Sequence, residues 1–141
     1  MLKRLLVIAM TAALAAGMSY AEQAKTITIP VTKTGATNGR VMYGSYCAPC
    51  HGVDGRGQGP VAFALKVPPP DLTLLSRNNH GKFPDSRVVV VLQSGTDIKA
   101  HGTAEMPVWG PILGKMNLNN PQERLLRISN LSRYLESLQV K

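Results

Sequence analysis

Two cysteines and one histidine, close together in the chain, have the clearest chemical meaning in this sequence. The only cysteines, Cys47 and Cys50, stand in the segment CAPCH, which ends at His51. This spacing is the pattern of a c-type haem attachment site. On one helical turn and its exit, the two thiols can form thioethers with the vinyl groups of one porphyrin, and the imidazole can bind its iron. The segment therefore predicts one covalent haem c with His51 as an axial ligand.

Other uses of this cysteine pair explain the pattern less well. A redox dithiol of the thioredoxin type normally lies in a βαβ pattern, and the sequence shows none. A zinc site needs about four ligands, and the chain offers two cysteines and three histidines. Exported proteins commonly contain disulfides, but a bridge between such close neighbours would be a poor structural staple. Haem attachment is the best interpretation.

A haem iron needs a second axial ligand or keeps an open coordination position. Met106 is the first candidate because it lies between a glycine and a proline in a loop with little helical character. Such a loop allows a thioether to lie against a metal. A methionine more often fills a hydrophobic core, and Met116, His80 and His101 are also chemically able to bind iron. From the residues alone, these candidates stay open.

The first residues predict an export signal. Lys3 and Arg4 are followed by an almost wholly apolar run over residues 5–18, and the small residues Ser19 and Ala21 stand at the two positions that a signal peptidase reads. This is the pattern of a secretory signal peptide, and the run is shorter than the ~20 residues of a membrane-spanning helix. We expect a signal peptide over residues 1–21 and a mature periplasmic protein that does not span the membrane.

The rest of the chain is long enough for one domain. Residues 22–36 predict an extended arm. Residues 26–31 alternate in the manner of a strand, but Pro30 limits them to an edge or a loose segment. A first helix over about residues 38–48 can be capped by Asn38 and ends in the cysteine motif.

Loops rich in glycine and proline occupy the middle of the chain. We expect short helices over residues 60–66 and from Asp71 onward, and a helix over residues 87–93 that Asp85 caps and Gly95 ends. The consecutive valines of that last segment would suit a buried strand equally well. Long loops are uncommon in a small domain unless something, such as a large buried cofactor, holds them.

The last helix is the clearest regular element. Asn120 stands at the cap position, Pro121 at the first helical position, and Glu123 completes a pattern like a capping box. Apolar residues then recur at spacings that place them on one helical face: Leu125, Ile128, Leu131, Leu135 and Leu138. Together these elements predict an all-α domain over residues 37–141, with long loops around one covalent haem.

At these residues the sequence resembles the class I c-type cytochromes, the bacterial monohaem cytochrome c family. The resemblance covers about residues 37–140. Matching positions fall in the first and last helices and in the loops between them: Gly39, Tyr43, the CAPCH motif, Gly59, Pro60, Leu65, residues 69–73, the segment MPVWG over residues 106–110, Tyr134 and Leu135.

The resemblance implies the cytochrome c fold and specific roles. In the family the first and last helices cross closely, with a glycine against an aromatic ring, which implies contact between Gly39 and Tyr134. The Gly-Pro turn implies that the carbonyl of Pro60 accepts a hydrogen bond from His51. The MPVWG segment looks like the family's distal methionine loop, which implies Met106 as the second axial ligand.

The resemblance says less about the haem edges. It implies that residues 69–73 wrap one edge of the haem. Trp109 is a candidate to pack on the porphyrin or to bond a propionate, with burial alone as the equal alternative. Arg56, Arg77 and Lys82 are candidates to face the propionates.

An iron with both axial positions filled has no site for a substrate, so the expectation is an electron-transfer protein and not an enzyme. It would act as a free shuttle or as a subunit of a dehydrogenase or oxidase, with redox proteins as donor and acceptor. The chain has a formal net charge of +8, which suits acidic docking surfaces; its basic residues are scattered, which does not favour nucleic acid. The alternative is a small haem enzyme or gas-binding sensor with an open sixth coordination site.

Overall fold

The computed structural model describes residues 31–95, 106–117 and 120–140, and every regular element in these ranges is a helix. The predicted signal peptide, residues 1–21, lies outside the described residues, as do residues 22–30 of the predicted arm. The α-helices are α2 (Gly39–Tyr46), α3 (Ala48–His51), α4 (Asp85–Ser94), α5 (Trp109–Lys115) and α6 (Pro121–Ser137). Short 3-10 helices lie between α3 and α4: η1 (Ala62–Ala64), η2 (Leu72–Leu74) and η3 (Arg77–Asn79). The all-α prediction is confirmed for this part of the chain.

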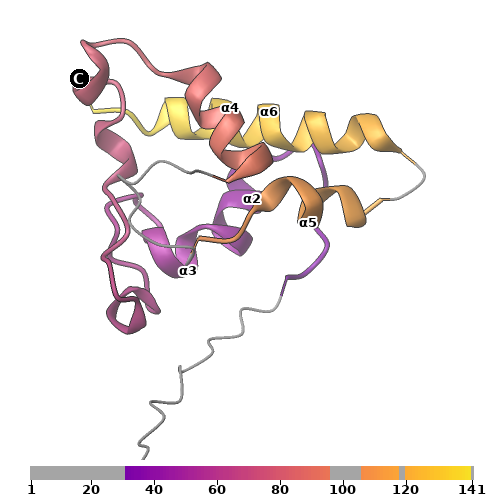
Figure 1. The fold of residues 1–141 in the computed structure, drawn as a ribbon, viewed down its shortest axis with the longest axis horizontal. Helices are drawn as coiled ribbons and strands as arrows, with labels where there is room; N and C mark the ends of the chain where they lie inside the picture. Colours follow the sequence, from indigo (N-terminus) through magenta and orange to yellow (C-terminus); the bar gives the residue numbers. More distant parts are fainter. Residues whose placement is uncertain (1–30, 96–105, 118–119, 141) are drawn as a thin grey trace, which may run out of the picture.

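The long helix α6 is the element on which the others pack. α2, α4 and α5 all contact it, and the loops between α3 and α4 form one side of the molecule, at the left in Figure 1. The core between the helices includes Met42, Leu92, Leu113 and Ile128, all buried. Within the described ranges, no helix combines the length and apolar character that crossing a membrane would require.

α2 crosses α6 at close range. α2 begins where the Asn38 side chain accepts a first-turn backbone hydrogen bond at 3.0 Å, as predicted. A Cβ atom on Gly39 would collide with the carbonyl oxygen of Asn130 and would lie 3.0 Å from Cβ of Tyr134. The rings of Tyr43 and Tyr134 pack with their centroids 5.2 Å apart. The predicted contact of Gly39 with Tyr134 is present, and the backbone of α6 is closer still.

The valine-rich segment forms α4, a helix and not a strand, and it ends at Gly95 (φ 72°) as predicted. The prediction that Asp85 caps this helix is wrong. Pro84 occupies the cap position, and the Asp85 carboxylate accepts a hydrogen bond from the Ser132 hydroxyl at 2.6 Å. A bond to the neighbouring helix α6 has replaced the local capping bond.

The start of α6 differs from the predicted capping box. The helix begins at Pro121, but the Asn120 side chain makes no capping hydrogen bond. The Glu123 carboxylate accepts hydrogen bonds from the side chains of Arg127 and Asn117 instead. Side chains close by in the sequence therefore engage the carboxylate that the capping-box pattern assigned to the helix end.

The buried face of α6 includes a charged residue in place of a predicted leucine. Ile128, Leu131 and Leu135 are buried, as their spacing predicts, but Leu125 is 50% exposed. Arg127 is only 1% exposed. The first turns of α6 therefore face a polar environment, and only the later turns face the apolar core.

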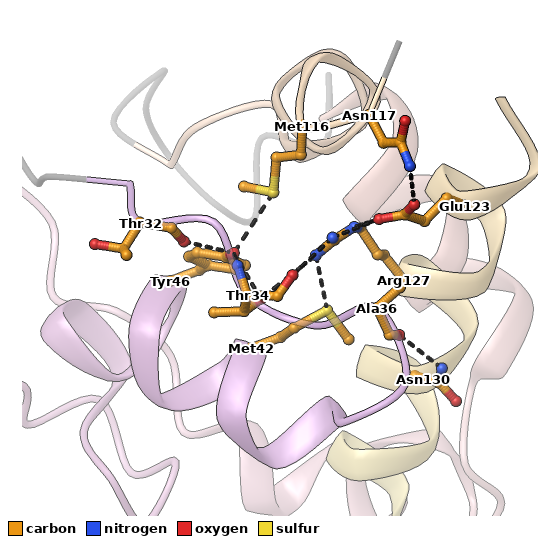
Figure 2. A network of polar contacts seen from close by, with 10 residues as sticks. All are labelled: Thr32, Thr34, Ala36, Met42, Tyr46, Met116, Asn117, Glu123, Arg127 and Asn130. Atoms are coloured by element: carbon orange, nitrogen blue, oxygen red, sulfur yellow. Dashed lines mark hydrogen bonds and ion pairs between the residues drawn. The ribbon is translucent and has the colours of Figure 1, made fainter. Parts of the chain in front are cut away.

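Arg127 is buried with its charge partnered (Figure 2). Its Nε donates to the Glu123 carboxylate at 3.0 Å, and its guanidinium also forms an ion pair with that carboxylate. The guanidinium donates further to the carbonyl of Thr34 at 2.7 Å. A buried cation left without a partner would be strongly destabilising, so these contacts hold the N-terminal segment, residues 31–36, against α6.

Further hydrogen bonds fix the same segment to α2 and α6. The Tyr46 hydroxyl donates to the Thr32 carbonyl at 2.8 Å, and the Asn130 amide donates to the Ala36 carbonyl at 2.9 Å (Figure 2). The described part of the predicted arm is thus bound to the domain and does not extend away from it.

Replacing Gly39 with alanine should destabilise the protein, because the new Cβ would collide with the Asn130 carbonyl oxygen. Overpacking of this kind lowers the free energy of unfolding by about 1–3 kcal/mol. Gly44 is the matched control, since it lies in the same helix with nothing within 4 Å of an added Cβ. Gly44→Ala should raise the free energy of unfolding by roughly 0.5–1 kcal/mol. Urea unfolding measures both, and equal effects would contradict the close crossing.

Stability should fall at acidic pH in part through Glu123. Hydrogen bonds from Asn117 and Arg127 hold the pKa of its carboxyl below the ordinary value of 4.5. A carboxyl with a lower pKa in the folded state stabilises the fold above its unfolded-state pKa, and this stabilisation is lost as the pH falls through the folded-state pKa. Glu123→Gln should therefore flatten the dependence of the unfolding free energy on pH below about 4.5.

Denaturant unfolding at a series of pH values measures this effect. Glu136→Gln controls for the loss of one negative charge, because Glu136 is exposed on the same helix. If the unfolding free energy falls equally steeply with decreasing pH in the wild type and in Glu123→Gln, the assigned role is contradicted.

Candidate functional site

The CAPCH segment folds into one tight turn at the end of α2. α2 ends at Tyr46, Cys47 stands at the cap position, and α3 follows from Ala48 to His51. The amides of Cys50 and His51 donate to the carbonyl of Cys47 at 3.1 and 2.8 Å. Both cysteines and the histidine therefore belong to one helical turn, which is the arrangement that their spacing predicts.

The two thiols are not joined in a disulfide. Cys47 is 9% exposed, and burial raises the pKa of its thiol to about 12; burial also raises the pKa of the Cys50 thiol. Such thiols stay protonated at neutral pH, whereas the reactive cysteine of a redox dithiol has a lowered pKa. Among the described residues, no three His, Cys, Asp or Glu side chains form a group that could hold a metal ion. The dithiol and zinc interpretations gain no support.

His51 is 7% exposed, and a carbonyl group orients its ring. Its Nδ1 lies 3.3 Å from the carbonyl oxygen of Pro70. Because a carbonyl oxygen can only accept, this contact places the ring hydrogen on Nδ1, so that Nε2 has the lone pair that could bind a metal. A hydrogen bond of this kind fixes the ring of a metal-binding histidine and raises its donor strength.

The resemblance implied Pro60 for this carbonyl, and the structure corrects it to Pro70. Pro60 is exposed in the turn before η1, and the amides on either side of it donate to carbonyls of α3 at 3.0 Å each. That turn is therefore attached to the backbone of α3. The acceptor for the ring comes from the segment over residues 69–73, which the resemblance placed at a haem edge.

The glycine-rich loop after His51 joins the histidine to the segment that holds its acceptor. The amide of Gly57 donates to the His51 carbonyl at 2.7 Å, and the amide of Leu72 donates to the Gly55 carbonyl at 2.7 Å. Gly52, Gly55 and Gly57 have φ angles of 80°, 82° and 81°, which residues with a side chain rarely adopt. We refer to residues 52–57 as the proximal loop.

Tyr43 attaches the start of the proximal loop to α2. Its hydroxyl donates to the carbonyl of Gly52 at 2.8 Å, and burial raises the pKa of this hydroxyl. The hydroxyl therefore stays a neutral donor over the ordinary pH range, and it fixes the residue directly after His51.

Met106 and Trp109 lie on the segment that leads into α5. Met106 is partly buried and packs against the hydrophobic core, of which Cys47 is a member. Trp109 is 4% exposed, and its ring stacks on that of Tyr46 with centroids 5.4 Å apart. Tyr46 directly precedes Cys47, so this stack ties the predicted distal segment to the cysteine turn. Packing of Trp109 on a porphyrin stays a prediction.

The other candidate axial ligands are less well placed. Figure 2 shows Met116 pointing toward Tyr46, with its sulfur 3.5 Å from the tyrosine hydroxyl and close to the N-terminal segment. His80 is exposed and has a left-handed φ of 57°, and His101 lies outside the described residues. A ligand of an iron inside the domain would have to face the interior, which disfavours the exposed His80. Met116 packs against the core as Met106 does, and only its contact with Tyr46 counts against it.

The basic residues considered for the propionates lie on the surface. Arg56 pairs with Asp54 at 3.6 Å, with both side chains more than half exposed, and Arg77 and Lys82 are also exposed. The exposed pair of Arg56 with Asp54 contributes little to stability, and Arg77 and Lys82 add positive charge to the surface.

Two features of this site were not predicted from the sequence: Pro70 as the partner of His51, and the role of Gly57 in the proximal loop. The only sequence signal for either is the close spacing of glycines after His51 and the prolines before Asp71.

Comparisons with known proteins found no relative of this chain. No family model, no curated protein and no solved structure matches this chain. The functional interpretation therefore depends on the chain's own residues and their geometry.

Proposed function

We propose that this protein carries single electrons by means of one covalently attached haem c. The observation that supports this most strongly is the turn at the end of α2, which brings Cys47, Cys50 and the buried His51 together. Two thiols outside any disulfide and an imidazole oriented by Pro70 fit the thioethers and the axial nitrogen of such a group. The close crossing of α2 and α6, with Gly39 against Tyr134, supports the cytochrome c fold, because the first and last helices of that family cross in this way.

The chain's own residues would hold the haem and tune it. When bound, the haem supplies an iron that changes between the ferrous and ferric states. Cys47 and Cys50 would anchor the porphyrin, while Pro70 keeps the ring of His51 in one orientation. Met106 would provide the second axial ligand, and a histidine–methionine pair tends to raise the reduction potential. Ligands held by packed segments would let the electron move with little rearrangement of the protein.

A carrier is favoured over an enzyme or gas sensor because Met106 would fill the sixth coordination position. Met106 lies three residues before Trp109, whose stacking on Tyr46 gives its segment a fixed attachment. A segment held in this way suits a permanent ligand better than one that gives way to a substrate. An open sixth coordination position would instead indicate a small haem enzyme or a gas-binding sensor.

The proposed setting is the periplasm, and the proposed partners are redox proteins with acidic docking surfaces. The export signal predicted over residues 1–21 supports the first point, and exposed basic residues such as Arg77 and Lys82 support the second. Opposite charges on two partners speed their encounter, and salt screens this effect. The protein would act as a free shuttle or as a subunit of a dehydrogenase or oxidase.

The purified exported protein should contain one haem that stays attached after denaturation. Haem staining on a denaturing gel and the absorption spectra of the ferric and ferrous forms measure this. Cys50→Ala should impair covalent attachment because one thioether is lost, whereas Ser45→Ala, in the preceding helix and outside the motif, should retain it. A wild-type protein without covalent haem would sink the proposal.

Met106→Ala should leave the haem attached but open the iron to small ligands. We expect loss of the weak near-red band of a ferric iron–sulfur bond, together with rapid binding of carbon monoxide to the ferrous form. Met116→Ala is the matched control, and it should keep the band because the sulfur of Met116 lies against Tyr46. If Met116→Ala loses the band and Met106→Ala keeps it, Met116 is the ligand. Carbon monoxide binding by the wild type would instead favour the enzyme or sensor.

A further inference from the structure

The proximal loop, residues 52–57, lies between His51 and the carbonyl that orients its ring. One side of the loop is bonded to the histidine, because the Gly57 amide donates to the His51 carbonyl at 2.7 Å. The other side is bonded to the segment that contains Pro70, because the Leu72 amide donates to the Gly55 carbonyl at 2.7 Å. The loop therefore sets the distance between the ring and its acceptor.

Gly57 is the point of closest approach within this arrangement. A Cβ atom built on Gly57 would collide with the carbonyl oxygen of Pro69 and would lie 3.1 Å from its carbonyl carbon and 3.5 Å from that of Pro70. Both neighbours are backbone atoms in a proline pair, whose fixed φ angles leave little freedom to adjust. A side chain at position 57 would push the Pro69–Pro70 backbone away from the loop.

We infer that Gly57 is a positioning residue that seats the Pro70 carbonyl on Nδ1 of His51 and thereby sets the electron-donating strength of the imidazole. This inference rests on the proposed function, because it concerns the axial nitrogen of a bound haem. Gly57 has this role because it has no side chain, and only a glycine lets the two backbones approach this closely.

The expected effect has a definite direction. A hydrogen bond from Nδ1 to a carbonyl makes Nε2 a stronger donor, and a stronger donor stabilises the ferric state over the ferrous state. When the Pro70 carbonyl moves away, His51 becomes a weaker donor, so the reduction potential should shift to a more positive value. Second-shell hydrogen bonding of this kind is one of the means by which a protein sets a haem potential.

The test compares Gly57→Ala with Gly81→Ala in the haem-containing protein. Both glycines have nearly the same left-handed φ, 81° and 82°, but a Cβ on Gly81 would meet nothing within 4 Å. Both substitutions therefore introduce backbone strain, and only Gly57→Ala displaces the proline pair. Redox titration measures the potential, and proton NMR measures how fast the Nδ1 hydrogen of His51 exchanges with solvent.

We expect a positive shift of the potential and faster exchange of the Nδ1 hydrogen in Gly57→Ala, with both values near the wild type in Gly81→Ala. The near-red band should persist in both, which shows that the distal ligand is retained. Equal potentials in the two variants would overturn the inference while the proposed function stands. A wild-type protein that holds no covalent haem would overturn the proposed function itself.

A milder variant decides the matter if Gly57→Ala does not accumulate. Tyr43→Phe keeps the ring that packs on Tyr134 but removes the hydroxyl bond to the Gly52 carbonyl, and so loosens the other anchor of the proximal loop. It should shift the potential in the same direction by a smaller amount. Tyr134→Phe, which alters the same ring pair without touching the loop, is its control, and identical potentials in these two variants would contradict the inference.

Discussion

The close crossing of α2 and α6 is the constraint on which the rest of the structure depends. Without a side chain, Gly39 lets the two helix backbones touch, since a Cβ there would strike the carbonyl of Asn130. The position of α2 then determines where Tyr43, Tyr46 and the cysteine turn lie. Tyr43 reaches the proximal loop and Tyr46 reaches the segment before α5. A shift of α2 on α6 would therefore move both sides of the candidate site together.

A buried polar network complements this apolar contact. Arg127, 1% exposed, joins Glu123 to the backbone of the N-terminal segment at Thr34. Replacing such a network by apolar residues can be neutral for stability, but breaking it is costly. Its directional bonds select one position for residues 31–36 across α2 and α6, which apolar contact alone would leave less well defined. Figure 2 shows that Met116 belongs to this region, on the side of Tyr46 where the N-terminal segment lies.

The candidate site is held largely by backbone groups. The carbonyls of His51 and Gly55 accept from backbone amides of the loop region at 2.7 Å each, and the Pro70 carbonyl accepts from the ring of His51 at 3.3 Å. Backbone atoms hold their positions better than long flexible side chains, so they can orient an imidazole with little loss of precision. The glycines of the proximal loop make this possible, because their positive φ angles let successive carbonyls point to different partners.

The sequence by itself determined the helical class, the helix starting after Asn38, the last helix, and the cysteine–histidine turn, because each depends on local spacing or capping. The tertiary structure decided which long-range partners the side chains take. Asp85 bonds across the fold to Ser132 rather than to its own helix end, since a partner in a less solvated interior is worth more than one at an exposed end. Pro70 and not Pro60 meets His51, and Arg127 is buried where Leu125 is exposed. No local sequence pattern predicts these partners or this burial, because they depend on how segments far apart in the chain come together.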